Sequence, residues 1–290
     1  METGSNDVLV IKNPNQEDIL IPFILKTVIL EVTDKHIYVD WEVWMKFTFI
    51  TLFPEIIRAY LNESIIKKAI EKSLIAFETI DPKDFLESKE RIDDKVYGGG
   101  PGMLLKSEPL MKALDEAISK SDKSKSKIIY LSPKGKEFSQ QVAEEMSEEK
   151  NLIFICGRYE GIDQRIIDHY VDEEISIGDY VLSGGELPAL VVCDAIARNI
   201  KGVLGDDSSL DQETFSKGLL EYPQYTRPEK MKLGEVPKEL LSGDHAAIST
   251  WRKKQMLGLT ASRRKDLFDK LNLSAEEKSL LEDFFNELKW

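Results

Sequence analysis

The sequence predicts an α/β protein whose mainly parallel sheet is followed by a separate helical region. From Met45 to Ile200, short apolar runs typical of buried strands alternate with amphipathic runs typical of helices, as in a parallel sheet covered by helices. The segment DDSSLDQE, residues 206–213, is polar and acidic like a linker, and the sequence after Glu213 is rich in helical patterns. The 290 residues suffice for two domains, since an average domain has roughly 150 residues.

We expect four segments along the chain. They are a β-rich piece over residues 1–44, an α/β domain over 45–204, a mobile linker over 205–212 and a helical domain over 213–290. In the first segment, DVLVIK, DILIPFI, TVILEV and HIYVDW are β-branched runs separated by Asn-Pro-Asn and Thr-Asp-Lys turn signals. Because 44 residues alone make only a marginal sheet, this segment is expected to be a short β extension.

The elements of the α/β domain follow in order. The near-continuous apolar run KFTFITLF, which begins at Lys46, predicts a buried parallel strand, and Pro54 predicts the start of an amphipathic helix that continues to Ile70. Further strands are predicted over 74–81, 127–132, 151–157 and 173–185, and further helices over 109–119, 139–146, 163–169 and 186–200. Near the end of the chain, Ser274 and Glu277 predict a capping box at the start of the last helix.

The net charge of the chain and the charge of one basic segment lead to opposite expectations about nucleic-acid binding. A net charge of −13 argues against generic binding to nucleic acid or to acidic membranes. The segment WRKKQMLGLTASRRK, residues 251–265, nevertheless carries six cations and no acid. A basic patch on an acidic body can bind a polyanion, but it can equally be a solvated helix face.

Several classes of protein and site are disfavoured. Cys156 and Cys193 have neither the spacing of a redox pair nor the density of a secreted scaffold, so both are expected to be buried and reduced. The three histidines are not grouped with acids or cysteines at ligand spacing, so no metal site is predicted. The most apolar stretch, 19–32, is interrupted by Pro22 and falls short of the roughly 20 residues of a membrane span. Without a signal-peptide pattern, a cytoplasmic protein with no membrane association is expected.

Four glycine-bearing loops follow strands or turns, over residues 97–103, 130–135, 156–161 and 177–188. Glycine allows positive φ and close approach of the backbone to a ligand, so such loops gathered at strand ends can enclose one small molecule. Each loop alone is also consistent with a tight turn. Two phosphate-binding motifs do not fit, because the glycines of 97–103 are spaced G-x-G-x-G and no G-K-[ST] follows any cluster.

Seven motifs, taken in order, resemble one enzyme family. They are LFPE (52–55), YGGGPGM (97–103), YLSPKG (130–135), CGRYEGID (156–163), ISIGDYVLSGGELPA (175–189), GVLG (202–205) and YPQYTRP (222–228). From Met45 to about Trp290 the chain resembles the bacterial tRNA (guanine-37-N1)-methyltransferases of the knotted SPOUT superfamily. The resemblance implies transfer of a methyl group from S-adenosylmethionine to N1 of guanosine-37, beside the tRNA anticodon, in support of reading-frame maintenance. It also implies a sheet tied in a deep trefoil knot, which no periodicity reveals.

The same resemblance implies the binding sites. The S-adenosylmethionine pocket is expected at Tyr130, Leu131, Ser132, Pro133, Gly157, Tyr159, Glu160, Ile177, Gly178, Asp179, Tyr180, Val181, Leu182, Gly184 and Gly185. The family also uses magnesium, expected near Glu160, although no ligand pattern in the sequence indicates it. With tRNA as the substrate, the cations of 251–265 are expected to contact phosphates. An obligate homodimer is implied, with each active site between the knot of one subunit and the helical domain of the other.

Methylation at guanine N1 needs an aligned methyl sulfonium, removal of the N1 proton and stabilisation of charge building toward O6. By the resemblance, Glu213 is the base and Arg198 the stabilising cation. The family usually has aspartate where this chain has Glu213, which is longer by one methylene, and nearby Asp211 is the alternative base. For Arg198 the alternative is a salt bridge at a helix end.

Two other functions stay open at this stage. One is a SPOUT methyltransferase that acts on ribosomal RNA or on another tRNA position, against which the YPQYTRP motif and the basic helices argue. The other is a noncatalytic RNA-binding or ribosome-assembly protein. That second reading is favoured by the altered acid and by residues 1–44, which resemble the closing part of the PRC-barrel domain of a bacterial ribosome maturation factor.

Overall fold

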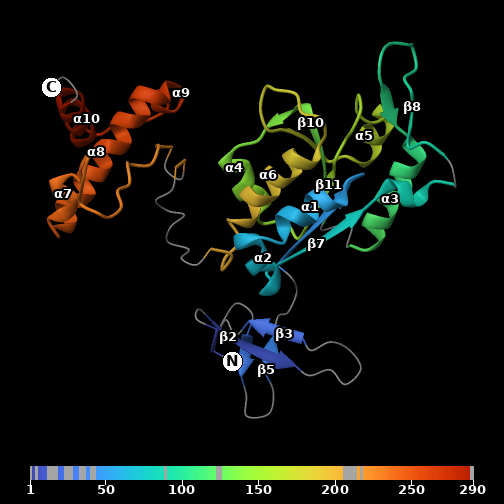
Figure 1. The fold of residues 1–290 in the computed structure, drawn as a ribbon, viewed down its shortest axis with the longest axis horizontal. Helices are drawn as coiled ribbons and strands as arrows, with labels where there is room; N and C mark the ends of the chain where they lie inside the picture. Colours follow the sequence, from blue (N-terminus) through green and yellow to red (C-terminus); the bar gives the residue numbers. More distant parts are fainter. Residues whose placement is uncertain are drawn as a thin grey trace. The chain divides into compact units, whose positions relative to one another are not determined.

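The structure is a computed structural model that describes most of the chain. The described residues are 2–3, 6–11, 19–22, 29–32, 37–39, 44–87, 90–121, 126–204, 214–215 and 218–287. The chain divides into two compact units, Met1–Gly205 and Asp206–Trp290 (Figure 1). The predicted linker over 205–212 lies outside the described residues, as do both candidate bases, Asp211 and Glu213.

A five-stranded parallel sheet forms the centre of the first unit and confirms the predicted α/β class. Its strands are β6 (Met45–Ile50), β7 (Ile75–Ile80), β10 (Ser126–Glu137), β11 (Asn151–Ile155) and β12 (Glu173–Ser176). The spatial order is β12-β10-β11-β6-β7, and every neighbouring pair is parallel. All five carboxyl ends therefore meet at one edge of the sheet, where the loops that follow the strands are brought together.

Helices cover both faces of this sheet, so its strands are apolar on both sides. On one face, Phe47, Phe49 and Phe154 pack in a cluster with residues of α1 (Pro54–Leu61), α2 (Ser64–Glu71), α4 (Gln140–Met146) and α6 (Glu186–Ala197). On the other face, Ile153 and Ile155 pack with α3 (Ser107–Ser119) and α5 (Gln164–Tyr170). Figure 1 shows these two helix layers on either side of the strands.

Three predicted elements differ most from those observed. The helix expected over 54–70 is two helices, α1 and α2, because the chain turns at Asn62 and Ser64 has φ 56°, outside the helical region. The strand expected over 173–185 ends at Ser176 as β12, and the remainder is a loop. The strand expected over 127–132 continues as β10 to Glu137, with an irregular register between Leu131 and Lys136.

Two small elements of the first unit were not expected from the sequence. Strands β8 (Asp93–Lys95) and β9 (Met103–Leu105) form an antiparallel hairpin whose tip holds the YGGGPG residues. A short 3-10 helix, η1, covers Pro82–Phe85. The hairpin strands are three residues long, which is too short for a period-two pattern to stand out in the sequence.

The N-terminal residues form antiparallel β-structure, as predicted. Strands β1 (Glu2–Thr3), β2 (Asn6–Ile11) and β3 (Ile19–Pro22) make one sheet, and β4 (Ile29–Val32) and β5 (Ile37–Val39) make a second, two-stranded sheet. Strands β3, β4 and β5 lie within three of the predicted runs, and β2 begins one residue before the run DVLVIK. The sequence does not predict β1.

The second unit is mainly helical. It contains a two-stranded sheet of β13 (Lys230–Met231) and β14 (Gly234–Glu235), followed by helices α7 (Lys238–Leu241), α8 (His245–Arg263), α9 (Lys265–Phe268) and α10 (Ala275–Glu287). Gly258 lets α8 and α10 approach closely, because a Cβ there would overlap the Phe284 ring. The predicted capping box is confirmed: Ser274 N donates to Glu277 Oε2 at 2.8 Å, and Glu277 N donates to Ser274 Oγ at 3.2 Å. Within the ranges that the structure describes, no helix has both the length and the apolarity to cross a membrane.

Candidate active site

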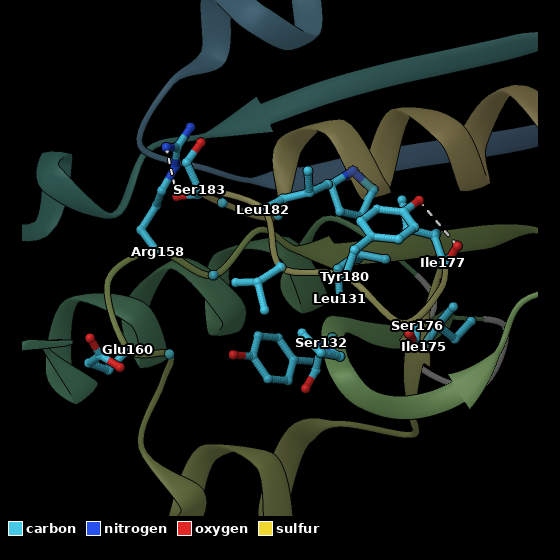
Figure 2. A pocket seen from close by; sticks show the side chains of 18 of the residues that line it. Leu131, Ser132, Arg158, Glu160, Ile175, Ser176, Ile177, Tyr180, Leu182 and Ser183 are labelled. Atoms are coloured by element: carbon cyan, nitrogen blue, oxygen red, sulfur yellow. Dashed lines mark hydrogen bonds between the residues drawn. The ribbon is translucent and has the colours of Figure 1, made fainter.

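A pocket of about 220 Å³ opens beside the irregular stretch of β10 and at the carboxyl ends of β11 and β12 (Figure 2). Three glycine-bearing segments form it: residues 130–135 lie within β10, and the loops 156–161 and 177–188 follow the neighbouring strands β11 and β12. This is the place in an open parallel sheet where ligands commonly bind. The predicted gathering of these three loops is therefore present in the structure.

Fourteen of the fifteen residues expected to hold S-adenosylmethionine line this pocket. They are Tyr130, Leu131, Ser132, Pro133, Gly157, Tyr159, Glu160, Ile177, Gly178, Tyr180, Val181, Leu182, Gly184 and Gly185. Asp179 does not line it, because this residue lies at the tip of a tight turn that Tyr180 N closes by donating to Gly178 O at 2.9 Å. The pocket also includes residues that the sequence did not single out: Arg158, Gly161, Ile175, Ser176, Ser183 and Pro188.

Two glycines allow the loops to come together without side chains between them. A Cβ at Gly185 would lie 2.7 Å from Cys156 Cα, and one at Gly157 would lie 2.9 Å from Tyr130 Cε2. Neither position accepts a side chain without a shift of its neighbours. The two loops are consequently in direct backbone contact, with Gly185 N donating to Gly157 O at 2.9 Å.

The walls of the pocket combine apolar side chains with tyrosines. Burial raises the pKa of Tyr130, which is 7% exposed, so its hydroxyl stays protonated at neutral pH. Tyr180 is half-exposed and donates from its hydroxyl to Ile177 O at 3.3 Å, which holds the ring over the pocket mouth (Figure 2). Leu131, Leu182 and Ile177 supply apolar surface around it. Such a mixture suits a flat, mostly apolar ligand with polar edges.

Cys156 lies directly behind the pocket but is not a nucleophile. It is 2% exposed, and burial raises the pKa of its thiol well above the usual range. Cys193 is buried in the same way and neither cysteine is in a disulfide, which confirms the predicted buried, reduced state.

The β8–β9 hairpin touches the pocket at Glu160. Glu160 N donates to Met103 O at 2.9 Å, and a Cβ at Gly102 would overlap the Glu160 side chain. The other glycines of the hairpin tip, Gly98 to Gly100, have no neighbour within 4 Å of the place that a Cβ would take, and they do not line the pocket. Thus only the base of the fourth glycine loop reaches the site.

Arg198 lies away from the pocket of its own chain. It is the C-cap residue of α6, whereas Gly184, Gly185 and Pro188 line the pocket at the opposite, N-terminal end of that helix. A helix of 12 residues is about 18 Å long. The two expected catalytic residues are thus not brought together by the described part of this chain, since Glu213 lies outside it.

The cations of 251–265 differ in their surroundings. Lys253 forms an ion pair with Glu277 at 2.8 Å, Lys254 with Glu287 at 2.5 Å, and Arg264 with Asp266 at 2.6 Å. The Arg252 guanidinium stacks on the Tyr222 ring, 4.6 Å from its centroid. Arg263 and Lys265 are exposed and have no carboxylate partner among residues 218–287.

Comparison with known proteins identifies relatives over most of the chain. Residues 45–270 match the family model described as tRNA (Guanine-1)-methyltransferase TrmD. A tRNA (guanine-N(1)-)-methyltransferase of Carboxydothermus hydrogenoformans is 52% identical over 245 residues, which cover 84% of this chain and 95% of the relative. Its counterpart in Treponema denticola is 50% identical over 248 residues, covering 84% and 100%, and that of Photobacterium profundum is 48% identical over 241 residues, covering 83% and 96%. The chain therefore belongs to the TrmD family of tRNA (guanine-1)-methyltransferases.

Proposed function

We propose that this protein transfers a methyl group from S-adenosylmethionine to N1 of guanosine-37 in tRNA. Family membership carries the proposal, because relatives about half identical over nearly their whole length are tRNA (guanine-N(1)-)-methyltransferases. The pocket supports it, since fourteen residues matched to the family's cofactor loops meet in one cavity. Neither alternative, a methyltransferase of another RNA position or a noncatalytic RNA-binding protein, has a comparable observation in its favour.

The residues of the pocket fit S-adenosylmethionine, which supplies an electrophilic methyl group when bound. The contact of the two loops at Gly157 and Gly185 closes one wall of a cavity that can enclose a small molecule. Leu131, Ile177 and Leu182 suit the faces of the adenine ring. The protonated Tyr130 forms a neutral boundary of the pocket.

We assign proton removal from guanine N1 to Glu213, with Asp211 as the alternative, and stabilisation of charge at O6 to Arg198. The N1 position of guanine carries a proton at neutral pH and is a poor nucleophile until a base removes it. A fixed guanidinium near O6 offsets the negative charge that this removal creates. Both assignments come from the family motif, and their test is given in the Discussion.

A homodimer completes this active site in our proposal. Arg198 is about a helix length from the pocket of its own chain, so a reaction that uses both needs a second copy. A surface for that copy exists on α1 and α6, where Ile56, Tyr60, Leu187 and Val191 are 37 to 56% exposed; we call it the α1/α6 apolar face. Helix α6 is apolar nearly all round, which is typical of a helix that becomes covered.

We further propose that the loops around the pocket are tied in the trefoil knot of the SPOUT superfamily. The domain division of the proposal is 45–204 for methyl transfer and 213–290 for tRNA, joined by the linker 205–212. Residues 1–44 are taken as a PRC-barrel-like appendage without a part in catalysis, because the family match starts at residue 45. Removing them is expected to leave methyl transfer near the parent level.

Glu160, near which magnesium is expected, faces the pocket as a single carboxylate. Within the described ranges no group of three His, Cys, Asp or Glu side chains comes together, so these residues form no metal site made of protein side chains alone. We derive no step through this ion.

One experiment tests the proposed function directly. The purified protein is incubated with labelled S-adenosylmethionine and, in separate reactions, with ribosomal RNA and with tRNA transcripts that carry guanosine or adenosine just 3′ of the anticodon. Methylation of the guanosine transcript alone, at N1, is the expected result. Methylation of both transcripts, or of ribosomal RNA instead, supports the other methyltransferase, and no methylation at all supports the noncatalytic protein.

A further inference from the structure

Glu186 is a buried acid next to the pocket to which the proposed reaction gives no part. It is the first residue of α6 and is 1% exposed. Its Oε1 accepts a hydrogen bond from Thr51 Oγ1 at 2.8 Å, and its Oε2 lies 2.8 Å from Arg158 Nη2. A carboxylate is costly to bury unless it is paired and hydrogen-bonded; here Oε1 is hydrogen-bonded, whereas Oε2 makes no hydrogen bond and depends on the charge of Arg158 alone.

Arg158, the partner of Glu186, is held on several sides. Its Nη1 donates to Ser183 O at 3.0 Å, a bond drawn in Figure 2, and its guanidinium lies 4.3 Å from the centroid of the Phe53 ring. The Arg158 side chain packs directly on the Gly184 backbone, since a Cβ at residue 184 would overlap Arg158 Nε. Lysine has no planar group to make these contacts at once, so the geometry is specific to arginine.

These contacts close into a ring. Thr51 Oγ1, which donates to Glu186, also accepts from Phe53 N at 3.0 Å, and the Phe53 ring faces Arg158. The ring joins the end of β6 to the loop of Arg158 after β11 and, through the Ser183 carbonyl, to the loop after β12. The last two loops line the pocket. Glu186 supplies the only negative charge among the four ring residues, Thr51, Phe53, Arg158 and Glu186.

We propose that Glu186 is a positioning residue for cofactor binding, which acts through Arg158 to hold the 156–161 and 177–188 loops in the arrangement that forms the pocket. The inference rests on the proposed function in taking S-adenosylmethionine as the ligand. Without the carboxylate, Arg158 is a largely buried cation with no counter-charge in the ring, and its hold on Ser183 is weakened. The two loops then close less well around the ligand.

Glu186→Gln tests the proposal with the least disturbance. The glutamine keeps the size of the side chain and can still accept from Thr51, but it removes the charge. Binding of S-adenosylhomocysteine, the demethylated product, is measured by titration calorimetry on the full-length protein. The expected affinity loss is about tenfold, equivalent to about 1.4 kcal/mol. Unchanged affinity overturns the proposal.

A double-mutant cycle tests whether Glu186 acts through Arg158. Arg158→Met is expected to weaken binding as well, and adding Glu186→Gln to it is expected to cost little more, because the charge to be neutralised is already gone. If the two losses multiply in the double variant, Glu186 does not act through Arg158 and the proposal fails.

Steady-state kinetics separate positioning from a general loss of folded protein. The Glu186→Gln variant is expected to show a KM for S-adenosylmethionine raised about tenfold, with kcat at saturating cofactor and KM for tRNA close to the parent values. A lower kcat with an unchanged KM for the cofactor indicates fewer active molecules instead, and this result overturns the proposal.

Thr51→Val decides the question if Glu186→Gln does not fold. Valine is close in size to threonine but cannot hydrogen-bond Glu186, so a loss of cofactor affinity of about threefold is expected from the loosened ring. Unchanged affinity in this folded variant rejects the proposal.

The calorimetry tests the role of Glu186 independently of the proposed function. If the wild-type protein binds S-adenosylhomocysteine but methylates no tRNA, only the proposed function is contradicted. The affinity of the Glu186→Gln variant then still decides the role of Glu186.

Discussion

Gly185 N donates a hydrogen bond to Gly157 O at 2.9 Å and thereby joins the loop after β12 to the loop after β11. Helix α5 and strand β12 separate the two glycines in the sequence, and both glycines line the pocket. A side chain at Gly185 has no room, since its Cβ would lie 2.7 Å from Cys156 Cα. The pocket therefore depends on this contact between the two loops.

Gly185→Ala is expected to abolish most cofactor binding. The added methyl group pushes against backbone that cannot move independently, and overpacking of this kind typically costs about 1 to 3 kcal/mol. Titration calorimetry with S-adenosylhomocysteine measures the effect. The matched control is Gly258→Ala in the second unit, where the methyl group overlaps Phe284. That variant is expected to lose stability but keep its cofactor affinity; equal affinity in both variants contradicts the prediction.

The C-terminal unit is expected to lose stability in acid through Glu277. Its hydrogen bond from Lys253, followed by that from Ser274 N, lowers the pKa of Glu277 from 4.5 to about 2. Because the folded pKa lies below the unfolded one, the ionised carboxylate stabilises the fold above about pH 4.5, and this contribution disappears as the pH falls toward 2. Glu277 is partly exposed, and its partner Lys253 is half-exposed, so solvent screens the pair and the effect is modest.

Melting of wild-type protein and Glu277→Gln, followed by helical circular dichroism from pH 7 to pH 2.5, checks this. The wild type is expected to have the higher Tm at pH 7, and the difference in Tm between the two proteins should disappear as the pH falls. Glu276→Gln is the control, because Glu276 is in the same first turn of α10 and has no ion pair within residues 218–287. A gap that stays constant with pH would show that the charge of Glu277 is not involved.

Much of the sheet could be predicted from the sequence, and the reason is burial on both faces. A strand such as Asn151–Ile155 is apolar from its second residue on because helices cover it on either side. The β8–β9 hairpin escaped prediction because its strands include the polar residues Asp93, Asp94 and Lys95. The order of the strands was not predictable either, since periodicity describes each segment separately and carries no information on its neighbours.

The candidate site was predicted through motifs and not through geometry. Residues inside the motifs, such as Gly157 and Gly185, could be matched one by one, and the structure brings them together. Arg158 and Ser183 lie in the same motifs, but the motifs do not predict the hydrogen bond between them, because that contact depends on how the two loops meet. From the sequence, Glu186 is an ordinary acidic residue in the first turn of a helix. Only its burial in the structure indicates a further role.

Arg263 and Lys265 are expected to carry more of the tRNA affinity than Lys253 and Lys254. The first pair is exposed without a carboxylate partner among residues 218–287, whereas the second pair is engaged by Glu277 and Glu287. The double variant Arg263→Ala, Lys265→Ala should therefore show a shallower slope of log K for tRNA binding against log salt concentration, by about one for each phosphate contact that is lost. Lys253→Ala with Lys254→Ala should change it less. Binding isotherms at several salt concentrations compare the two, and equal slopes mean that pairing does not decide which cations bind.

Glu213→Gln tests the proposed general base, because glutamine keeps the size of the side chain but cannot take up the proton. A positioned base typically contributes about a hundredfold to ten-thousandfold in rate, so turnover should fall by roughly that amount with cofactor binding intact. Glu213→Asp should stay active, because aspartate is the commoner family residue. Single-turnover methylation of tRNA measures both variants. If Asp211→Asn abolishes turnover and Glu213→Gln does not, the base is Asp211.

Mixing two inactive variants tests whether the active site is shared between subunits. Gly185→Ala disables the pocket and Arg198→Ala removes the stabilising cation, and each variant alone is expected to be nearly inactive. In a mixed dimer, the intact pocket of one subunit meets the intact Arg198 of the other, so one of the two sites is whole. After free exchange of subunits about half of the dimers are mixed, and the mixture should regain about a quarter of the parent activity.

The mixture has a control in the α1/α6 apolar face. Val191 is 50% exposed in the middle of α6, and Val191→Glu places a charge where a second copy is expected to pack. With this change in both variants, sedimentation should show monomers and the regained activity should vanish. If instead each pocket used the Arg198 of its own chain, a mixed dimer would contain no intact site, and mixing would restore nothing with or without the change at Val191.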